Sequence, residues 1–187
     1  MTDGRTALFP GTFDPFTNGH LDLTRRAVRL FDRVIIAVAP SPAKGTLFTA
    51  DERVDMIRAA TRTMRRVEVV TFSDLVVSCA RRLGAQVMIR GLRAVSDFEF
   101  EFQMALMNRR LSPGVEVVFL MPSQQYTYLN STLVKEVARL GGKVRGLVPQ
   151  VVESKLKARL GAAGRPAGAA GRRGSGAKRR ARPGAGA

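Results

Sequence analysis

The chain has 187 residues and 45% of them are hydrophobic, which is enough to bury one domain core. The single cysteine excludes an intrachain disulfide and a cysteine metal cluster. The sequence has no apolar run near the ~20 residues that span a bilayer, which predicts a soluble, cytoplasmic protein. The net charge of +16 raises nucleic acid as a partner, although seven of the 31 basic residues lie within residues 161–187.

A short apolar segment, residues 7–9, predicts a first strand, and the spacing of apolar residues predicts a helix over residues 21–31. The loop between them is rich in Gly and Pro and ends at His20, the only histidine. The start of a helix presents unpaired backbone N–H groups and a partial positive charge, so the Thr12 hydroxyl and the His20 imidazole suit a phosphate there. The local pattern fits equally well a histidine that only caps or packs at an ordinary strand-to-helix turn.

Residues 34–39 predict a second strand, and the loop that follows contains Lys44. This lysine is either a solvated loop residue or a point charge that faces a bound phosphate, and the pattern favours neither. Thr49 and Glu52 have the spacing of a capping box, which predicts that the second helix begins there.

Residues 67–70 and 87–89 predict the third and fourth strands. Between them, Leu75, Cys79 and Leu83 have the spacing of one helical face, so we expect Cys79 to lie in the core.

Two arginines, Arg90 and Arg93, follow the fourth predicted strand, and Gly91 between them would let the backbone approach a ligand. Arginine forks match phosphate oxygens bidentately, although solvated surface charge is the ordinary interpretation of such a loop. Because both arginines follow a strand at the sheet edge where the His20 loop emerges, we expect them at the same site.

Residues 98–102 alternate between Phe and Glu, which taken alone is typical of a half-exposed strand. Strong helix formers follow them, and Phe98, Phe102 and Ala105 fit helical positions i, i+4 and i+7. We therefore predict a helix over residues 96–110.

Residues 115–120 predict the fifth strand, and a connecting segment leads from it to a helix that begins near Ser131. Asn130, Ser131 and Thr132 supply a cap, hydroxyls and backbone donors at the positive end of that helix. Capping explains one of the three. Three in a row, opposite the helix that follows the first loop, indicate a triphosphate held between two helix N-termini.

The alternation of apolar strands and helices, with a last helix after Pro149, predicts a single α/β domain over residues 1–160. We expect a Rossmann-like parallel sheet with helices on both faces and a ligand site beyond the carboxyl ends of its strands. Residues 161–187 consist almost entirely of Gly, Ala, Pro, Arg and Lys, so they cannot bury enough apolar surface to become ordered. We expect a disordered basic tail, either a solubilising appendage or a weak binder of polyanions.

Four segments together resemble the bacterial phosphopantetheine adenylyltransferase family of the nucleotidyltransferase superfamily. They are residues 10–20, 41–44, 89–99 and 131–136. The first carries the superfamily's T/HxGH motif as Thr17-Asn18-Gly19-His20, and the last two narrow the resemblance to the family. The similarity extends over residues 6–160; the Asn130-Ser131-Thr132 run departs from the family's serines but keeps capping and hydroxyl chemistry.

The resemblance implies transfer of an adenylyl group from ATP to 4'-phosphopantetheine, which gives dephospho-coenzyme A and pyrophosphate in the penultimate step of coenzyme A biosynthesis. It also implies Mg²⁺, a homohexamer and feedback inhibition by coenzyme A. On the matching positions, it implies an acceptor side of Thr12, Lys44, Val76 and Arg90. It implies a nucleotide side of Thr12, Phe13, His20, Gly91, Leu92, Arg93, Glu101, Tyr126, Thr127, Tyr128, Leu129, Asn130, Ser131 and Thr132.

For this reaction the protein mainly has to position two anions and neutralise the charge that develops during in-line attack on the α-phosphorus. A phosphate monoester is already anionic near neutral pH, so no general base is needed. We expect His20 to donate a hydrogen bond to the α-phosphate in the transition state, with Arg93 and Mg²⁺ on the pyrophosphate side. Lys44 and Arg90 would hold the acceptor phosphate.

Two other functions fit parts of the sequence. Another adenylyltransferase or cytidylyltransferase, acting on a nucleotide or a small phosphorylated alcohol, would share the first motif. A basic nucleic-acid-binding protein would explain the net charge. Against it, aromatic residues, which stack on bases in such proteins, make up only 6% of the chain.

Overall fold

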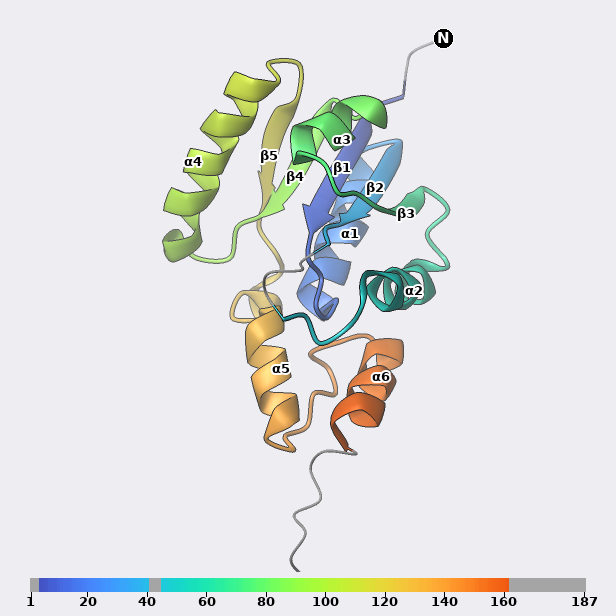
Figure 1. The fold of residues 1–187 in the computed structure, drawn as a ribbon. Helices are drawn as coiled ribbons and strands as arrows, with labels where there is room; N and C mark the ends of the chain where they lie inside the picture. Colours follow the sequence, from blue (N-terminus) through green and yellow to red (C-terminus); the bar gives the residue numbers. More distant parts are fainter. Residues whose placement is uncertain (1–3, 41–44, 162–187) are drawn as a thin grey trace, which may run out of the picture.

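The structure of the protein, a computed structural model, describes residues 4–40 and 45–161. Five parallel strands form one sheet at its centre (Figure 1), in the order β3-β2-β1-β4-β5. The sequence-predicted strands are confirmed, with ends that differ by one or two residues. The strands are β1 (Thr6–Gly11), β2 (Arg33–Val38), β3 (Val67–Thr71), β4 (Val87–Gly91) and β5 (Glu116–Leu120).

The described residues form six α-helices. The predicted capping box is present at the start of the second, where the Thr49 hydroxyl accepts from the N–H of Glu52 (3.2 Å) and the Glu52 carboxylate accepts from the N–H of Thr49 (2.8 Å). The alternation of strands and helices confirms the Rossmann-like α/β class. The helices are α1 (Asn18–Leu30), α2 (Ala50–Thr61), α3 (Val76–Arg82), α4 (Val95–Leu111), α5 (Ser131–Arg139) and α6 (Gln150–Gly161).

Side chains along each central strand alternate between two hydrophobic clusters, one on each face of the sheet. On β1, Ala7 and Phe9 face the larger cluster, to which α1, α2 and α6 contribute, whereas Leu8 faces a smaller cluster with α3. Cys79 on α3 is fully buried in the smaller cluster, as predicted. Leu75 was predicted on the same helical face, but it precedes α3 as the N-cap residue and is exposed, because the helix begins one residue later.

Helix α4 confirms the helix predicted over residues 96–110, and it stands beside β5 at one end of the sheet (Figure 1). Its aromatic side chains are not core residues. Phe98 and Phe102 are each 47% exposed and stack on each other with ring centroids 5.6 Å apart. The helix therefore presents an uncovered apolar face.

Helices α5 and α6 lie beyond the carboxyl ends of the strands (Figure 1). The chain before α6 contacts the start of α1, where the N–H of Asn18 donates to the carbonyl of Leu147 (2.9 Å) and its amide side chain donates to that of Gly146 (2.7 Å). Strand order reverses between β1 and β4, and the His20 loop leaves the sheet at this switch point, as predicted. The space between the strand ends and α5 is therefore the natural place for a ligand.

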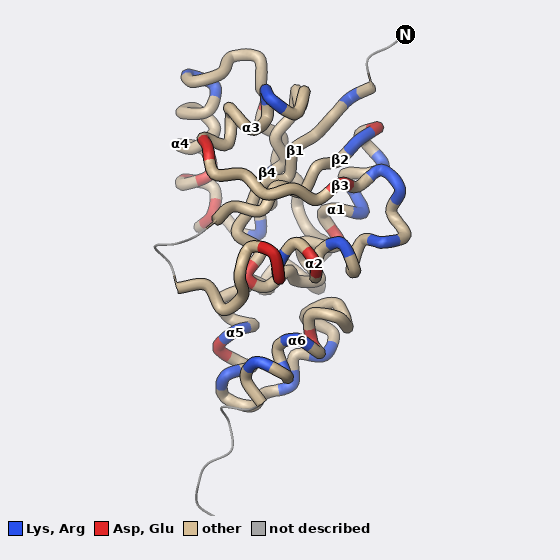
Figure 2. Tube along the Cα trace, turned by 45° about the vertical axis from the view of Figure 1, so that its right-hand side comes forward, with Lys and Arg blue, Asp and Glu red and all other residues tan. Residues whose placement is uncertain are grey.

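The predicted disordered tail falls outside the described residues, apart from Gly161 at the end of α6, and stays a prediction. In the part of the chain that the structure describes, no helix has both the length and the apolar character needed to cross a membrane. The Lys and Arg of the described residues are spread over several sides of the molecule, including α5 and α6 (Figure 2).

Candidate active site

A cavity of about 550 Å³ lies between the first loop, the end of β4 and the start of α5. It opens at the carboxyl edge of the sheet, next to the switch point, so the fold brings together segments that are far apart in the sequence. Most of the residues predicted for the nucleotide side line it, namely Thr12, Phe13, His20, Gly91, Arg93, Glu101, Tyr126, Leu129, Asn130, Ser131 and Thr132.

Three residues predicted for the nucleotide side do not line this cavity, namely Leu92, Thr127 and Tyr128. The N–H of Leu92 donates to the carbonyl of Leu120 (3.0 Å), and the Thr127 hydroxyl donates to the carbonyl of Gln124 (2.9 Å). Tyr128 is exposed. In this structure these residues shape the segments around the cavity and do not form its wall.

The imidazole of His20 is held in one tautomer by the N-terminus of α1. Its Nδ1 accepts from the backbone N–H of Thr17 (3.0 Å), and the Thr17 hydroxyl lies 3.1 Å from the same nitrogen. An Nδ1 atom that accepts a backbone hydrogen bond carries no proton, so in the neutral ring the proton is on Nε2. The capping box at Thr17 thus supplies an N–H donor on the side of the ring that is turned away from the cap.

Aromatic residues enclose the same ring. The centroid of His20 lies 5.1 Å from that of Phe13, at an edge-to-face angle, and 5.6 Å from that of Phe16, which is stacked. Burial, with a smaller contribution from the charge of Arg93, lowers the pKa of His20 from 6.5 to about 4. His20 is therefore a neutral hydrogen-bond donor near pH 7 and not a cation.

The titration of His20 can be observed directly, because the chain has one histidine and so one set of imidazole resonances. In an NMR pH titration of the ligand-free protein we expect a midpoint near 4, with ¹⁵N shifts of a ring protonated on Nε2. A midpoint near 6.5 would contradict the burial and the hydrogen bond from Thr17.

The same shift predicts how His20 affects stability. The folded pKa, about 4, lies below the unfolded value of 6.5, so the neutral ring contributes its full stabilisation above pH 6.5. We expect this contribution to be lost as the pH falls from 6.5 towards 4, because the unfolded chain then binds the proton first. Urea unfolding of the wild type and a His20→Gln variant across this range measures the contribution.

Arg90, at the end of β4, is held by a carboxylate. Its guanidinium binds Glu101 of α4 through two short hydrogen bonds, Nε to Oε2 (2.7 Å) and Nη2 to Oε1 (2.6 Å), and Nη1 donates to the carbonyl of Pro10 (3.3 Å). These bonds use three of the five N–H groups of an arginine and leave two for a ligand. Glu101 lies directly against an arginine predicted for the acceptor side, so it belongs to the boundary between the two sides.

Arg93 forms a similar pair with Asp97, at the start of α4. Its Nε and Nη2 each donate to an Asp97 oxygen at 3.0 Å, and Nη1 donates to the carbonyl of Leu129 (3.2 Å). Burial acts to raise the pKa of Asp97, but the hydrogen bonds and charge of Arg93 outweigh it and leave that pKa below its usual range. The arginine thus joins α4 to the segment that precedes α5.

One residue of the first loop, Phe13, has an unusual backbone conformation. Phe13 has φ of 51°, a left-handed conformation that is uncommon outside glycine, and its buried ring packs edge-on against Phe9 (centroids 5.3 Å apart). Because the ring is in the core, the backbone of Phe13 is the part left to contact a ligand.

Gly91 lies close to a buried side chain of α1 as well as to the cavity. A Cβ atom at this position would lie 2.7 Å from Cδ1 of Leu23 on α1. The close approach predicted for Gly91 is therefore, in part, an approach to a neighbouring helix.

The N-terminus of α5 meets the first loop at the cavity. Asn130 is its cap residue and accepts from the N–H of Leu133 (2.8 Å), as predicted, while the Ser131 hydroxyl donates to the carbonyl of Pro15 (2.8 Å). The starts of α1 and α5 both line the cavity, so two helix N-termini face one space. Such an arrangement suits an anion.

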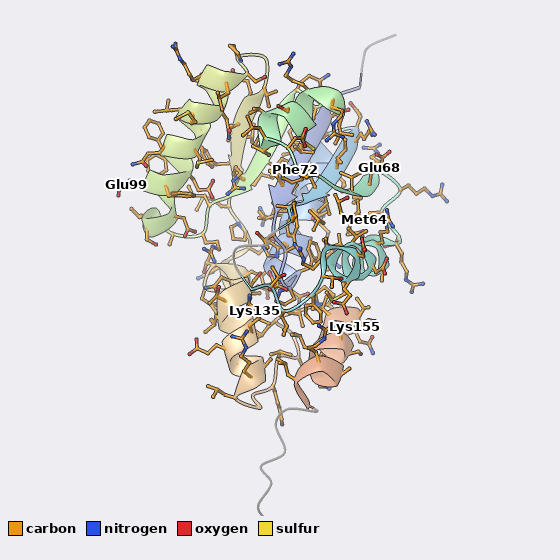
Figure 3. The ribbon with its side chains drawn as sticks, viewed as in Figure 1. Met64, Glu68, Phe72, Glu99, Lys135 and Lys155 are labelled. Atoms are coloured by element: carbon orange, nitrogen blue, oxygen red, sulfur yellow. The ribbon has the colours of Figure 1, made fainter. Side chains whose placement is uncertain are left out.

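Lys135 and Asp14 are site residues that sequence reasoning missed. Lys135, on α5, lines the cavity and forms an ion pair with the buried Asp14 (2.8 Å); it is labelled in Figure 3.

Sequence reasoning also missed Asp22, on α1. Its carboxylate accepts from the N–H (2.8 Å) and the hydroxyl (2.9 Å) of Ser123, which connects the segment after β5 to α1. These pairs join residues more than 100 positions apart, so the only local signal was an acidic residue within the first loop.

A second, smaller cavity of about 250 Å³ adjoins the first. Thr12, Val76 and Arg90, all predicted for the acceptor side, line it together with Glu101 and apolar residues such as Phe72 (Figure 3). Lys44, the fourth predicted acceptor residue, lies outside the described residues.

Residues 8–137 match the sequence profile of the cytidylyltransferase-like family, so the chain has the fold of a nucleotidyltransferase. The chain is 52% identical over 157 residues to the phosphopantetheine adenylyltransferase of Moorella thermoacetica, across 84% of this chain and 98% of that protein. It is 55% identical over 155 residues to the phosphopantetheine adenylyltransferase of Thioalkalivibrio sulfidiphilus, across 83% of this chain and 98% of that protein. The chain therefore belongs to the phosphopantetheine adenylyltransferase family of enzymes.

Proposed function

We propose that the enzyme transfers the adenylyl group of ATP to 4'-phosphopantetheine, giving dephospho-coenzyme A and pyrophosphate, as the penultimate, cytoplasmic step of coenzyme A biosynthesis. The observation that carries the proposal is the junction of two unlike cavities. The larger is polar and is flanked by two helix N-termini, which suits a nucleotide triphosphate. The smaller is mostly apolar and meets the larger at Thr12 and Arg90, which suits an apolar arm that ends in a phosphate.

In this proposal the acceptor phosphate lies at the junction and attacks the α-phosphorus of ATP in line. The neutral Nε2–H of His20 donates to the α-phosphate as its charge develops, and Arg93 faces the departing pyrophosphate. Arg90, with Lys44, offsets the repulsion between the two substrates. No general base is assigned, since the acceptor phosphate is already an anion.

Mg²⁺ is proposed to enter with ATP. The two carboxylates that line the larger cavity, Asp14 and Glu101, are both ion-paired, and no three acidic, His or Cys side chains cluster among the described residues. A Mg²⁺ ion commonly keeps most of its water ligands and binds through substrate phosphates, so a site without a set of free carboxylates can still take it together with ATP. There it would neutralise charge on the pyrophosphate group.

The test is an assay of pyrophosphate release from ATP with 4'-phosphopantetheine, nicotinamide mononucleotide or a small phosphorylated alcohol as acceptor. We expect turnover with the first alone. Turnover with nicotinamide mononucleotide but not with 4'-phosphopantetheine would favour another nucleotidyltransferase. In the described part of the chain, Lys and Arg are spread over several helices and strands and do not gather on one element (Figure 2), so this part gives the nucleic-acid alternative no support.

Coenzyme A is proposed as a feedback inhibitor for the same geometric reason. It contains both a pantetheine arm and an adenine nucleotide, so it would compete for the two joined cavities.

We propose that the enzyme assembles into a homo-oligomer, with a hexamer as the expected form, through the exposed apolar side chains of α4. Large apolar side chains are exposed on this helix on either side of Glu99, which points away from the sheet (Figure 3). Exposed apolar side chains that gather on one element are typical of an interaction site on a protein. On α4 these side chains are Val95, Phe98, Phe100, Phe102, Met104, Leu106, Met107 and Leu111.

A single charge among these side chains should disrupt assembly. We expect Met107→Glu to lower the mass measured by light scattering, because Met107 is 55% exposed and a buried carboxylate without a partner is costly. Gln150→Glu, which adds the same charge at an exposed position of α6, is the matched control. An unchanged mass for Met107→Glu would assign assembly to another surface.

A further inference from the structure

A buried guanidinium behind the candidate site is not explained by the proposed chemistry. Arg53, on α2, is 2% exposed, and its hydrogen bonds go to backbone carbonyls. Its Nη1 donates to the carbonyls of Thr12 and of Ala39 (2.8 Å), and its Nε donates to those of Phe48 and Thr49 (both 3.2 Å). One side chain thus joins the first loop, the end of β2 and the segment before α2.

Asp14 binds the backbone amides of the same segment. Its carboxylate accepts from the N–H groups of Leu47 (2.9 Å) and Phe48 (3.0 Å). Arg53 therefore takes the carbonyls and Asp14 takes the amides around Phe48, so both kinds of backbone group are held there. Burial lowers the pKa of Arg53 and the charge of Asp14 acts to raise it, but an arginine stays charged near neutral pH.

Two of the carbonyls that Arg53 holds belong to residues that line the smaller cavity, Thr12 and Ala39. The same guanidinium holds the carbonyls of Phe48 and Thr49, just before α2. Arg53 thus connects two residues of the smaller cavity's wall to the start of α2.

We propose that Arg53, with Asp14, is a positioning residue that holds the first loop, the end of β2 and the segment before α2 as one unit, and thereby sets the geometry of the acceptor subsite in the smaller cavity. The proposal rests on the proposed function for the identity of the acceptor. A planar fork that donates to four carbonyls cannot be replaced by lysine, whose ammonium is a point donor. This set of hydrogen bonds from Arg53, which we call the clamp, is therefore specific to arginine and does not depend on positive charge alone.

The test is Arg53→Lys, assayed well below its melting temperature. We expect the KM for 4'-phosphopantetheine to rise roughly tenfold and kcat to fall, with the ATP dissociation constant within about twofold of wild type. Arg58→Lys is the matched control, because Arg58 lies on the same helix, donates to the carbonyl of Val69 (3.2 Å) and lines neither cavity. It should leave all three constants unchanged.

A merely structural role would lower the melting temperature of Arg53→Lys and leave the acceptor KM as in the wild type, and this result would overturn the proposal. An equal weakening of ATP would overturn it too. If wild-type enzyme does not release pyrophosphate with 4'-phosphopantetheine, the proposed function fails. Hydrogen exchange then still tests whether Arg53 and Asp14 hold these segments as one preformed unit.

Hydrogen exchange of the wild-type protein tests this unit without a substitution, and so covers the case in which Arg53→Lys does not fold. We expect the amides of Leu47 and Phe48 to be protected in the free protein and no better protected after 4'-phosphopantetheine is added. Free exchange of these amides, or protection that arises only with the acceptor, would show that the unit is not preformed.

Discussion

Replacing His20 with alanine is expected to lower turnover by on the order of 10²–10³ while ATP affinity changes far less. The ring is a neutral donor fixed by the Thr17 cap, so its Nε2–H is already oriented before the charge on the α-phosphate develops. A preorganised donor of this kind acts mainly on the transition state. The measurement is kcat from pyrophosphate release together with the ATP dissociation constant from calorimetry.

His20→Gln separates the donor from the ring. A glutamine keeps a side-chain N–H at a similar reach, so it should recover part of the turnover that alanine loses. The aromatic contacts with Phe13 and Phe16 are lost in both variants, which makes them a matched pair. Collapse of ATP binding with unchanged turnover at saturation would show that His20 serves binding alone.

Much of the fold could be predicted because the local signals agree with the final structure. The apolar runs of β1 and β2 are buried on both faces and so read as central parallel strands. The Phe-Glu alternation at residues 98–102 was resolved by the helix formers that follow it. The exposure of Phe98 could not be predicted, because periodicity shows that a face is apolar but not whether a neighbouring element covers it.

Site residues could be predicted where they belong to a short sequence motif at the end of a strand. His20 and Arg93 follow strands and Arg90 lies near the end of β4, and parallel strands bring those ends to one edge. The counter-charges were not predictable from pattern. Glu101 reaches Arg90 only because of where α4 packs, and burial of Asp14 became evident only from the placement of α5.

These counter-charges change how the site should be understood. The arginines expected to bind phosphates are not bare cations in the ligand-free protein, since each has a carboxylate of α4 within 3.0 Å. The acids hold the guanidinium planes in fixed directions and reduce the net charge of the open site. An incoming phosphate must therefore use the remaining N–H groups or displace a carboxylate.

Arg90→Ala is expected to weaken 4'-phosphopantetheine by roughly 10- to 100-fold, which corresponds to about 1.5–3 kcal/mol for a hydrogen bond to a charged group. ATP should weaken less, because Arg90 lies at the junction with the smaller cavity. Arg90→Lys should recover only part of the loss if the contact is bidentate. Calorimetry with each substrate on each variant gives the two affinities separately.

The ion pair makes a second explanation of such a loss possible, and a double-mutant cycle distinguishes the two. Removing Arg90 leaves the Glu101 carboxylate, which is 13% exposed, without the partner that it binds at 2.6 and 2.7 Å. An unpaired carboxylate there would repel a phosphate even if Arg90 never touched one. We expect Glu101→Gln alone to have a small effect on the acceptor, and Arg90→Ala with Glu101→Gln to stay close to Arg90→Ala. Recovery of wild-type acceptor affinity in the double variant would mean that Arg90 only neutralises Glu101 and does not bind the acceptor.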